Sequence, residues 1–190
     1  MRLPLIVGIS GASGVIYGIE MLKALKRLGQ PAHLILTRTA AQNIRLETDY
    51  TPEEVLSLAS KVYGEDDMAA AVSSGSFRTQ GMVVIPCSIK TLSGVANSFG
   101  YNLMIRCADV TLKERRPLIL MVRETPLHRG HLELMTRAAD MGAIILPPVP
   151  AFYHRPESIS DLIRQGIEKA LDLLGIDHDL YPRWPSPQAE

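Results

Sequence analysis

The chain has 190 residues, of which 46% are hydrophobic, with 20 Lys and Arg against 20 Asp and Glu. This length fits one domain with a sizeable core. A formal net charge of zero argues against proteins that bind nucleic acid or anionic membranes, which usually carry a clear cationic excess. Two cysteines are too few for a disulfide scaffold. We expect no membrane span and no signal peptide, and hence a cytoplasmic protein, because no apolar run reaches roughly 18 residues.

Short apolar segments alternate with segments of helical periodicity. Strands are predicted at residues 3–9, 32–36, 82–85, 118–122 and 143–146. Helices are predicted at residues 16–28, 39–46, 89–96, 103–112 and 132–141, and capping signals at Thr51 and Ser158 open two more. This alternation predicts a parallel sheet covered by helices on both faces. We expect residues 1–175 to form this α/β domain and residues 176–190 to form an extended tail.

Two turns at predicted strand ends suit an anion, because ligands of such sheets bind beyond the carboxyl ends of the strands. The turn Ser10-Gly11-Ala12-Ser13-Gly14 offers free amides at a helix start. It is neither a strict G-x-G-x-x-G nor a Walker sequence, yet phosphate binding is favoured over a tight packing turn. For Ser88-Ile89-Lys90-Thr91, phosphate binding and simple helix capping are equally good interpretations. Together the two turns favour one phosphorylated ligand over a dinucleotide.

Charged side chains gather in the middle of the chain, at Arg106, Lys113, Glu114, Arg115, Arg116, Arg123 and Glu124. Arg115 and Arg116 are interpreted as a solvated helix face. Arg123 and Glu124 end an apolar strand, so we expect them at the ligand crevice. Paired with Lys113, they could hold a phosphate and pass it a proton.

Other reactive side chains fit packing better than chemistry. Cys87 precedes a helix start that would stabilise a thiolate, but no activating base is evident, and Cys107 lies in an apolar helical stretch. His128 and His131 lack a third metal ligand. Asp66-Asp67 lacks the second carboxylate cluster of a magnesium diphosphate site, so we expect a metal-free site.

Aromatic residues are concentrated after the last predicted strand, in Ala151-Phe152-Tyr153-His154-Arg155-Pro156. A lid over the ligand crevice and a loop anchored by its apolar rings are equally good interpretations. Trp184, the only tryptophan, lies in the tail and is expected to close over a neighbouring surface.

Taken together, these segments resemble the UbiX-like flavin prenyltransferases, formerly named aromatic-acid decarboxylases. The resemblance covers nearly the whole chain in an ordered set of motifs, at residues 8–14, 46–49, 73–77, 86–94, 108–118, 122–128 and 147–156. It implies a single-domain Rossmann-like (flavodoxin-like) fold that binds FMN, assembled as a homo-oligomer that is typically a dodecamer in the family. It also implies transfer of a dimethylallyl group from dimethylallyl phosphate to N5 and then C6 of reduced FMN. The product, prenylated FMN, would serve a UbiD-type decarboxylase, often in ubiquinone synthesis.

The resemblance also assigns residues by position. Those implied to contact FMN are Gly11, Ala12, Ser13, Thr37, Ser88, Ile89, Lys90, Thr91 and Arg123. Those implied to bind the prenyl phosphate or lie near it are Tyr153, Lys169, Arg106, Lys113 and Trp184, and those implied to act in catalysis are Glu124, Lys113, Glu47 and Ser13. Lys169 replaces an expected arginine, which keeps the charge but loses the bidentate fork.

The residue types suit this chemistry. Cations such as Lys113 can neutralise a departing phosphate without metal, and aromatic faces such as Tyr153 steady an allylic cation. Glu124 or the departing phosphate would take the proton lost from flavin C6. Two alternatives stay open: an FMN-dependent decarboxylase of the cysteine-substrate kind, whose His and Cys set is not evident here, and a non-catalytic FMN carrier, which has no use for a second anion pocket.

Overall fold

A parallel sheet forms the centre of the computed structural model, which describes residues 2–153 and 155–179. Its strands are β1 (Leu5–Ile9), β2 (Ala32–Leu36), β3 (Lys61–Tyr63), β4 (Gly81–Cys87), β5 (Leu118–Val122) and β6 (Ile144–Ile145). Their order is β3-β2-β1-β4-β5-β6, and every neighbouring pair is parallel. This is the strand order of doubly wound Rossmann folds, so the predicted fold class is confirmed.

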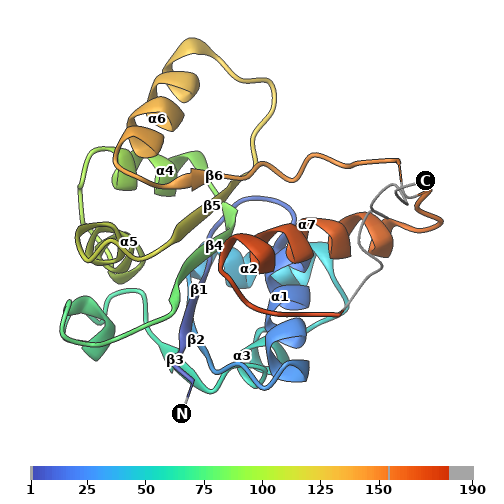
Figure 1. Ribbon diagram of the computed structural model, residues 1–190, viewed down its shortest axis with the longest axis horizontal. Coiled ribbons are helices and arrows are strands. Elements are labelled where there is room, and N and C mark those ends of the chain that lie inside the picture. Colours follow the sequence, from blue (N-terminus) through green and yellow to red (C-terminus); the bar gives the residue numbers. More distant parts are fainter. Residues whose placement is uncertain (1, 154, 180–190) are drawn as a thin grey trace, which may run out of the picture.

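Helices cover both faces of the sheet (Figure 1). One face carries α1 (Val15–Arg27), α2 (Arg38–Glu47), α3 (Pro52–Leu56) and α7 (Ile159–Leu173). The other carries α4 (Ile89–Ala96), α5 (Leu103–Lys113), α6 (Arg129–Asp140) and the short 3-10 helix η1 (Ala71–Ser73). Among the described residues, no helix is both long enough and apolar enough to cross a membrane.

Alternation along the strands divides the core into two layers. Leu5, Val7 and Ile9 of β1 pack with the helices of the first face, whereas Ile6 packs with those of the second. Successive strand residues point to opposite faces. Because both faces are covered, β1, β4 and β5 are buried along their whole length and read in the sequence as continuous apolar runs.

Most predicted elements are confirmed, with ends that differ by a few residues. The capping boxes at Thr51 and Ser158 are present. The strand β3 was not predicted, because this short edge strand of 3 residues has two exposed residues and no apolar run. At the start of the predicted tail, Ile176 packs into the first core layer.

Candidate active site

The strand order reverses between β1 and β4, and doubly wound folds bind their ligands beyond the carboxyl ends of the strands at such a point. Four segments singled out from the sequence follow strands at this edge: residues 10–14 after β1, Thr37 after β2, residues 88–91 after β4, and Arg123 with Glu124 after β5. The fold therefore brings these segments to one edge of the sheet, as expected from the sequence.

Hydrogen bonds connect three of these segments. The buried Ser10 donates to the Pro86 carbonyl from its backbone N, at 3.2 Å, and from its Oγ, at 2.9 Å. The same Oγ accepts from the backbone N of Ser88 at 2.8 Å. On the other side, the backbone N of Arg123 donates to the Cys87 carbonyl at 3.0 Å. Ser10 was named in the first turn but was given no role of its own, although a hydroxyl directly after a fully buried strand is a usable signal.

Glu47, the last residue of α2, lies at the start of α1. Its Oε2 accepts from the backbone N of Gly14 at 2.7 Å and of Val15 at 3.3 Å. The contact places this carboxylate beside Ser13, so two predicted catalytic residues lie together. It also changes the interpretation of the first turn, because two of the amides that suited a phosphate already hold a carboxylate. Among the described residues, the amides of Gly11 and Ser13 have no hydrogen-bond acceptor, so they are available to a ligand.

The start of α2 is closed in a similar way. Thr37 caps this helix, with its Oγ1 accepting from the backbone N of Ala40 at 3.2 Å, and its hydroxyl proton remains able to donate. The Oε1 of Glu65 accepts from the backbone N of Arg38 at 3.0 Å. A carboxylate therefore lies at the start of α2 as well as at that of α1.

Among the described residues, no carboxylate binds the amides at the start of α4. Ser88 caps it, with its Oγ accepting from the backbone N of Thr91 at 3.3 Å. The amides of Ile89 and Lys90 have no hydrogen-bond acceptor within residues 2–153 and 155–179. An anion at this point would meet two free donors and the positive end of the helix dipole.

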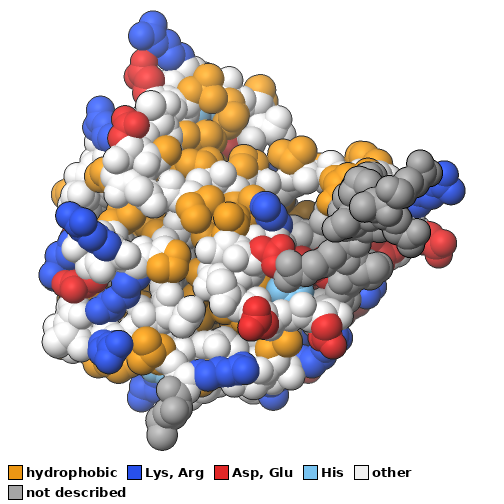
Figure 2. Space-filling view, viewed as in Figure 1, with side chains coloured by type: hydrophobic (Ala, Val, Ile, Leu, Met, Phe, Trp, Pro, Cys, Tyr) orange, Lys and Arg blue, Asp and Glu red, His pale blue; other side chains and the backbone are white. Residues whose placement is uncertain are grey.

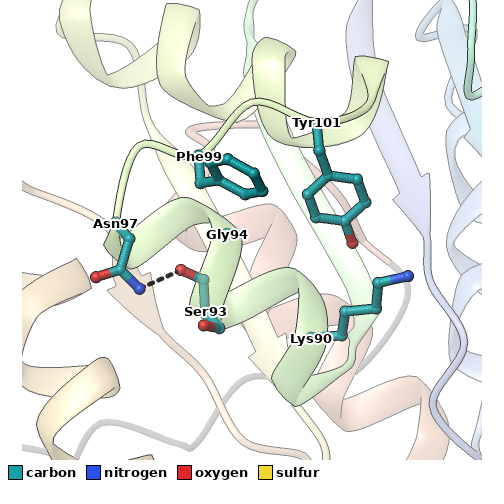
Figure 3. A pocket seen from close by; sticks show the side chains of 6 residues that line it. All are labelled: Lys90, Ser93, Gly94, Asn97, Phe99 and Tyr101. Atoms are coloured by element: carbon teal, nitrogen blue, oxygen red, sulfur yellow. Dashed lines mark hydrogen bonds between the residues drawn. The ribbon is translucent and has the colours of Figure 1, made fainter.

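A groove of about 410 Å³ lies beside α4 and is lined by Lys90, Ser93, Gly94, Asn97, Phe99 and Tyr101 (Figure 3). The Lys90 ammonium lies 5.0 Å from the centroid of the Tyr101 ring, a cation–π contact. Phe99 is 67% exposed at the groove. The groove thus adds an aromatic surface and a cation next to the open helix start.

Arg123 and Glu124 are both exposed at the end of β5. Glu124 Oε1 accepts from the backbone N of Thr125 at 3.0 Å. Arg123 has no carboxylate partner in the described part of the chain, so its guanidinium is available to an anionic ligand.

Two predicted phosphate-binding cations lie elsewhere in the chain. Lys113 ends α5, which precedes β5, so it lies at the amino edge of the sheet and is separated from Glu124 by the length of this strand of 5 residues, about 16 Å. Its Nζ contacts Glu114 Oε1 at 2.7 Å, which lowers the pKa of that carboxyl. Arg106 donates to the Ser73 carbonyl at 3.1 Å and pairs with Asp109. The expected grouping of Lys113 with Arg123 and Glu124 is therefore wrong within one chain.

Arg116 also differs from its prediction as part of a solvated helix face. It donates to the carbonyls of Gly75 at 2.7 Å and Phe77 at 2.8 Å. These hydrogen bonds connect the loop after η1 to the segment between α5 and β5. Arg115, in contrast, is exposed as expected.

The aromatic loop and Lys169 lie on a part of the chain that leads away from this edge. In Figure 1 the segment after β6 runs outward before it turns back into α7. Phe152 is 66% exposed and Tyr153 62%, so these two rings are not packed into the core of the described chain, and the lid and the anchored loop both stay predictions. Lys169 is exposed on α7. His154 and Trp184 lie outside the described residues.

The two cysteines are buried, as expected, and His128 and His131 contact each other. Cys87 is completely buried, which raises the pKa of its thiol, and burial raises the pKa of Cys107 to about 12. His128 caps α6, and its ring stacks on His131 with centroids 3.5 Å apart. No group of three His, Cys, Asp or Glu among the described residues is placed to hold a metal ion.

A doubly wound sheet with open donors at its carboxyl edge defines the class of nucleotide- and flavin-binding α/β proteins. Comparisons with known proteins narrow this class. The family profile described as Flavoprotein matches residues 2–168. The flavin prenyltransferase UbiX of Thauera aromatica is 55% identical over 180 residues, which cover 95% of this chain and 93% of that protein.

Two solved structures are similar throughout. AnUbiX (PadA1) in complex with FMN and dimethylallyl pyrophosphate has a TM-score of 0.96 and 47% identity, over 98% of this chain and 99% of that one. A dodecameric FMN-dependent UbiX-like decarboxylase from Escherichia coli O157:H7 has a TM-score of 0.94 and 43% identity, over 97% of this chain and 100% of that one. The chain therefore belongs to the UbiX family of flavin prenyltransferases. This confirms the resemblance and the predicted enzyme class, and it does not favour the decarboxylase or carrier alternatives.

Proposed function

We propose that this enzyme transfers a dimethylallyl group from dimethylallyl phosphate to N5 and C6 of reduced FMN. The observation that carries the proposal is 55% identity to a flavin prenyltransferase over 95% of the chain. One similar structure holds dimethylallyl pyrophosphate together with FMN. The choice of the monophosphate thus stays a prediction, which a comparison of the two donors tests.

The donors at the carboxyl edge fit FMN. The amides of Ile89 and Lys90 and the exposed Arg123 guanidinium can all donate to a phosphate. Glu47 and Glu65, at the starts of α1 and α2, would repel it. We therefore infer that the FMN phosphate binds at the start of α4, with residues 11–13 and Thr37 along the same edge. When bound, reduced FMN supplies the nucleophilic N5 and C6.

The remaining site residues would bind the prenyl phosphate and take part in its reaction. Arg106, Lys113 and Lys169 would neutralise the leaving phosphate, and Tyr153 would bind it while its ring steadies the allylic cation. Trp184 would add a second aromatic surface. Glu124 would accept the proton released from C6, at the same edge as the FMN residues. Ser13 and Glu47, held together by the Gly14 contact, would orient the reacting groups.

A homo-oligomer would bring these groups together. Within one chain, α5 holds Lys113 at the edge of the sheet opposite Glu124. Large apolar side chains are exposed, among them Phe99, Phe152 and Ile159, and Figure 2 shows apolar groups gathered on the visible surface. One similar protein is dodecameric. We therefore infer an assembly of the same kind, in which a neighbouring copy supplies the α5 cations.

The product indicates which enzyme would receive it and in which pathway. Prenylated FMN would pass to a UbiD-type decarboxylase, and ubiquinone synthesis is one pathway that such an enzyme serves. The two free, buried thiols suit a reducing compartment, which supports a cytoplasmic location.

An anaerobic incubation tests the proposed function. Purified enzyme, reduced FMN and dimethylallyl phosphate are mixed without added metal, and the released flavin is weighed by mass spectrometry. A flavin heavier by one five-carbon prenyl unit is the expected result. Unmodified FMN that stays bound to the folded protein would instead support a carrier, and a parallel reaction with dimethylallyl pyrophosphate decides the donor.

A further inference from the structure

The regular pairing of β4 with its two neighbouring strands is interrupted just before the segment that leads into α4. The β1–β4 ladder ends at the pair Gly8 and Val84, and the register between β4 and β5 shifts between Val84 and Cys87. Beyond this point, Ser10 connects the end of β1 to the segment that leads into α4. Its backbone N and Oγ both donate to the Pro86 carbonyl, and its Oγ accepts from the backbone N of Ser88. The side chain is completely buried, at 0% exposure.

We propose that Ser10 is a positioning residue for the flavin phosphate. The hydroxyl of Ser88 is used to cap α4 through the Thr91 amide, so the link from this helix start to β1 runs through the Ser88 backbone N. Ser10 Oγ is the acceptor of that amide. By fixing Ser88, it fixes the directions of the Ile89 and Lys90 amides that follow. The inference rests on the proposed function, because it requires the FMN phosphate at the start of α4.

Loss of the Ser10 hydroxyl would leave the Ser88 amide without its acceptor. A part-buried amide does not remain unpaired without cost, so the first turn of α4 would shift to find another partner. The two open amides would then be misaligned with a phosphate. The flavin ring, in contrast, is not bound by these amides and would be affected much less.

The test compares FMN with riboflavin, which lacks the phosphate. Dissociation constants of both flavins are measured by fluorescence titration of the full-length apoprotein, and thermal unfolding is recorded in parallel. In Ser10→Ala, the affinity for FMN should fall about tenfold while that for riboflavin changes little, so the preference for FMN falls by the same factor. Thr111→Val is the matched control. This substitution also removes a buried hydroxyl, which donates to the Cys107 carbonyl at 2.7 Å. Thr111, however, lies in the last turn of α5 and not at the start of α4.

The outcomes distinguish failure of the proposed function from failure of the positioning role of Ser10. If the wild-type protein binds neither flavin, the proposed function fails. If the wild type prefers FMN and Ser10→Ala retains that preference, the positioning role of Ser10 is overturned, whatever happens to stability. A similar loss of preference in Thr111→Val would also overturn it, because destabilisation alone would then explain the effect. If Ser10→Ala does not fold, Ser10→Cys, which keeps a small side chain with a weak acceptor and a weak donor, must show the same fall to a smaller extent.

Discussion

The Oε2 of Glu47 lies 2.7 Å from the backbone N of Gly14, which precedes it by 33 residues in the chain. The contact joins the end of α2 to the start of α1 and places a negative charge at the positive end of that helix. It also holds the turn that carries Ser13. Glu47 therefore has a structural role in addition to the catalytic one that we propose.

Substitution of Glu47 should separate these roles. Glu47→Ala removes both the acceptor and the charge, and it should lower the free energy of unfolding by about 1 kcal/mol, measured by urea denaturation. Glu47→Gln keeps an acceptor and should retain most of the stability, while prenyl transfer falls in both variants. Glu133→Ala, which removes an exposed carboxylate paired with Arg129, should cost less than about 0.5 kcal/mol. Equal stability losses in Glu47→Ala and Glu133→Ala would contradict the capping role.

Restoring the expected arginine at position 169 should improve donor binding. Lys169→Arg adds a planar, bidentate donor on the exposed face of α7, so the KM for dimethylallyl phosphate should fall by about threefold to tenfold at saturating FMN. Lys26→Arg, at an exposed site in the last turn of α1, should leave KM unchanged. A KM that does not change in Lys169→Arg would remove this residue from the donor site.

Glu124 should act late in the reaction. In Glu124→Gln, ring closure at C6 should slow by about a hundredfold because the proton acceptor is lost, whereas consumption of dimethylallyl phosphate continues. Phosphate release and the absorption spectrum of the flavin distinguish the two steps. Glu157→Gln, an exposed substitution before α7, is the control. Ring closure at the wild-type rate would exclude Glu124 as the base.

The thiols should not react in the folded enzyme. Burial raises the pKa of Cys107 to about 12 and that of Cys87 further, so neither forms an appreciable amount of thiolate at pH 8. A chromogenic disulfide reagent should label no thiol in the native protein and two in denaturant. Rapid labelling of the native protein would point instead to an accessible nucleophile.

Glu168 should make stability depend on pH. Burial and the nearby Asp172 raise its pKa from an ordinary value near 4.5 to about 7. The folded protein therefore binds this proton more tightly than the unfolded chain, and the resulting stability is present below about pH 4.5 and is lost as the pH rises through about 7. Glu168→Gln should remove this decline and stabilise the protein at pH 8 by about 1 kcal/mol, allowing for solvent screening. Parallel curves of unfolding free energy against pH for the two proteins would refute the assignment.

The sequence by itself determined the elements, the fold class and the family. Apolar runs marked the buried strands, capping boxes at Thr51 and Ser158 marked helix starts, and ordered motifs identified the flavin prenyltransferases. These signals can be recognised in the sequence because they depend on residues a few positions apart. The short strand β3 was missed because it lies at the sheet edge without an apolar run.

Only the tertiary structure decided which residues meet. Glu47 reaches Gly14 and Ser10 reaches Ser88 because strand order and helix packing bring distant segments together, the latter across 78 residues. The same topology separates Lys113 from Glu124, although they are close in sequence, because the extended strand β5 lies between them. Local patterns specify elements, whereas the composition of a site depends on how those elements are arranged in space.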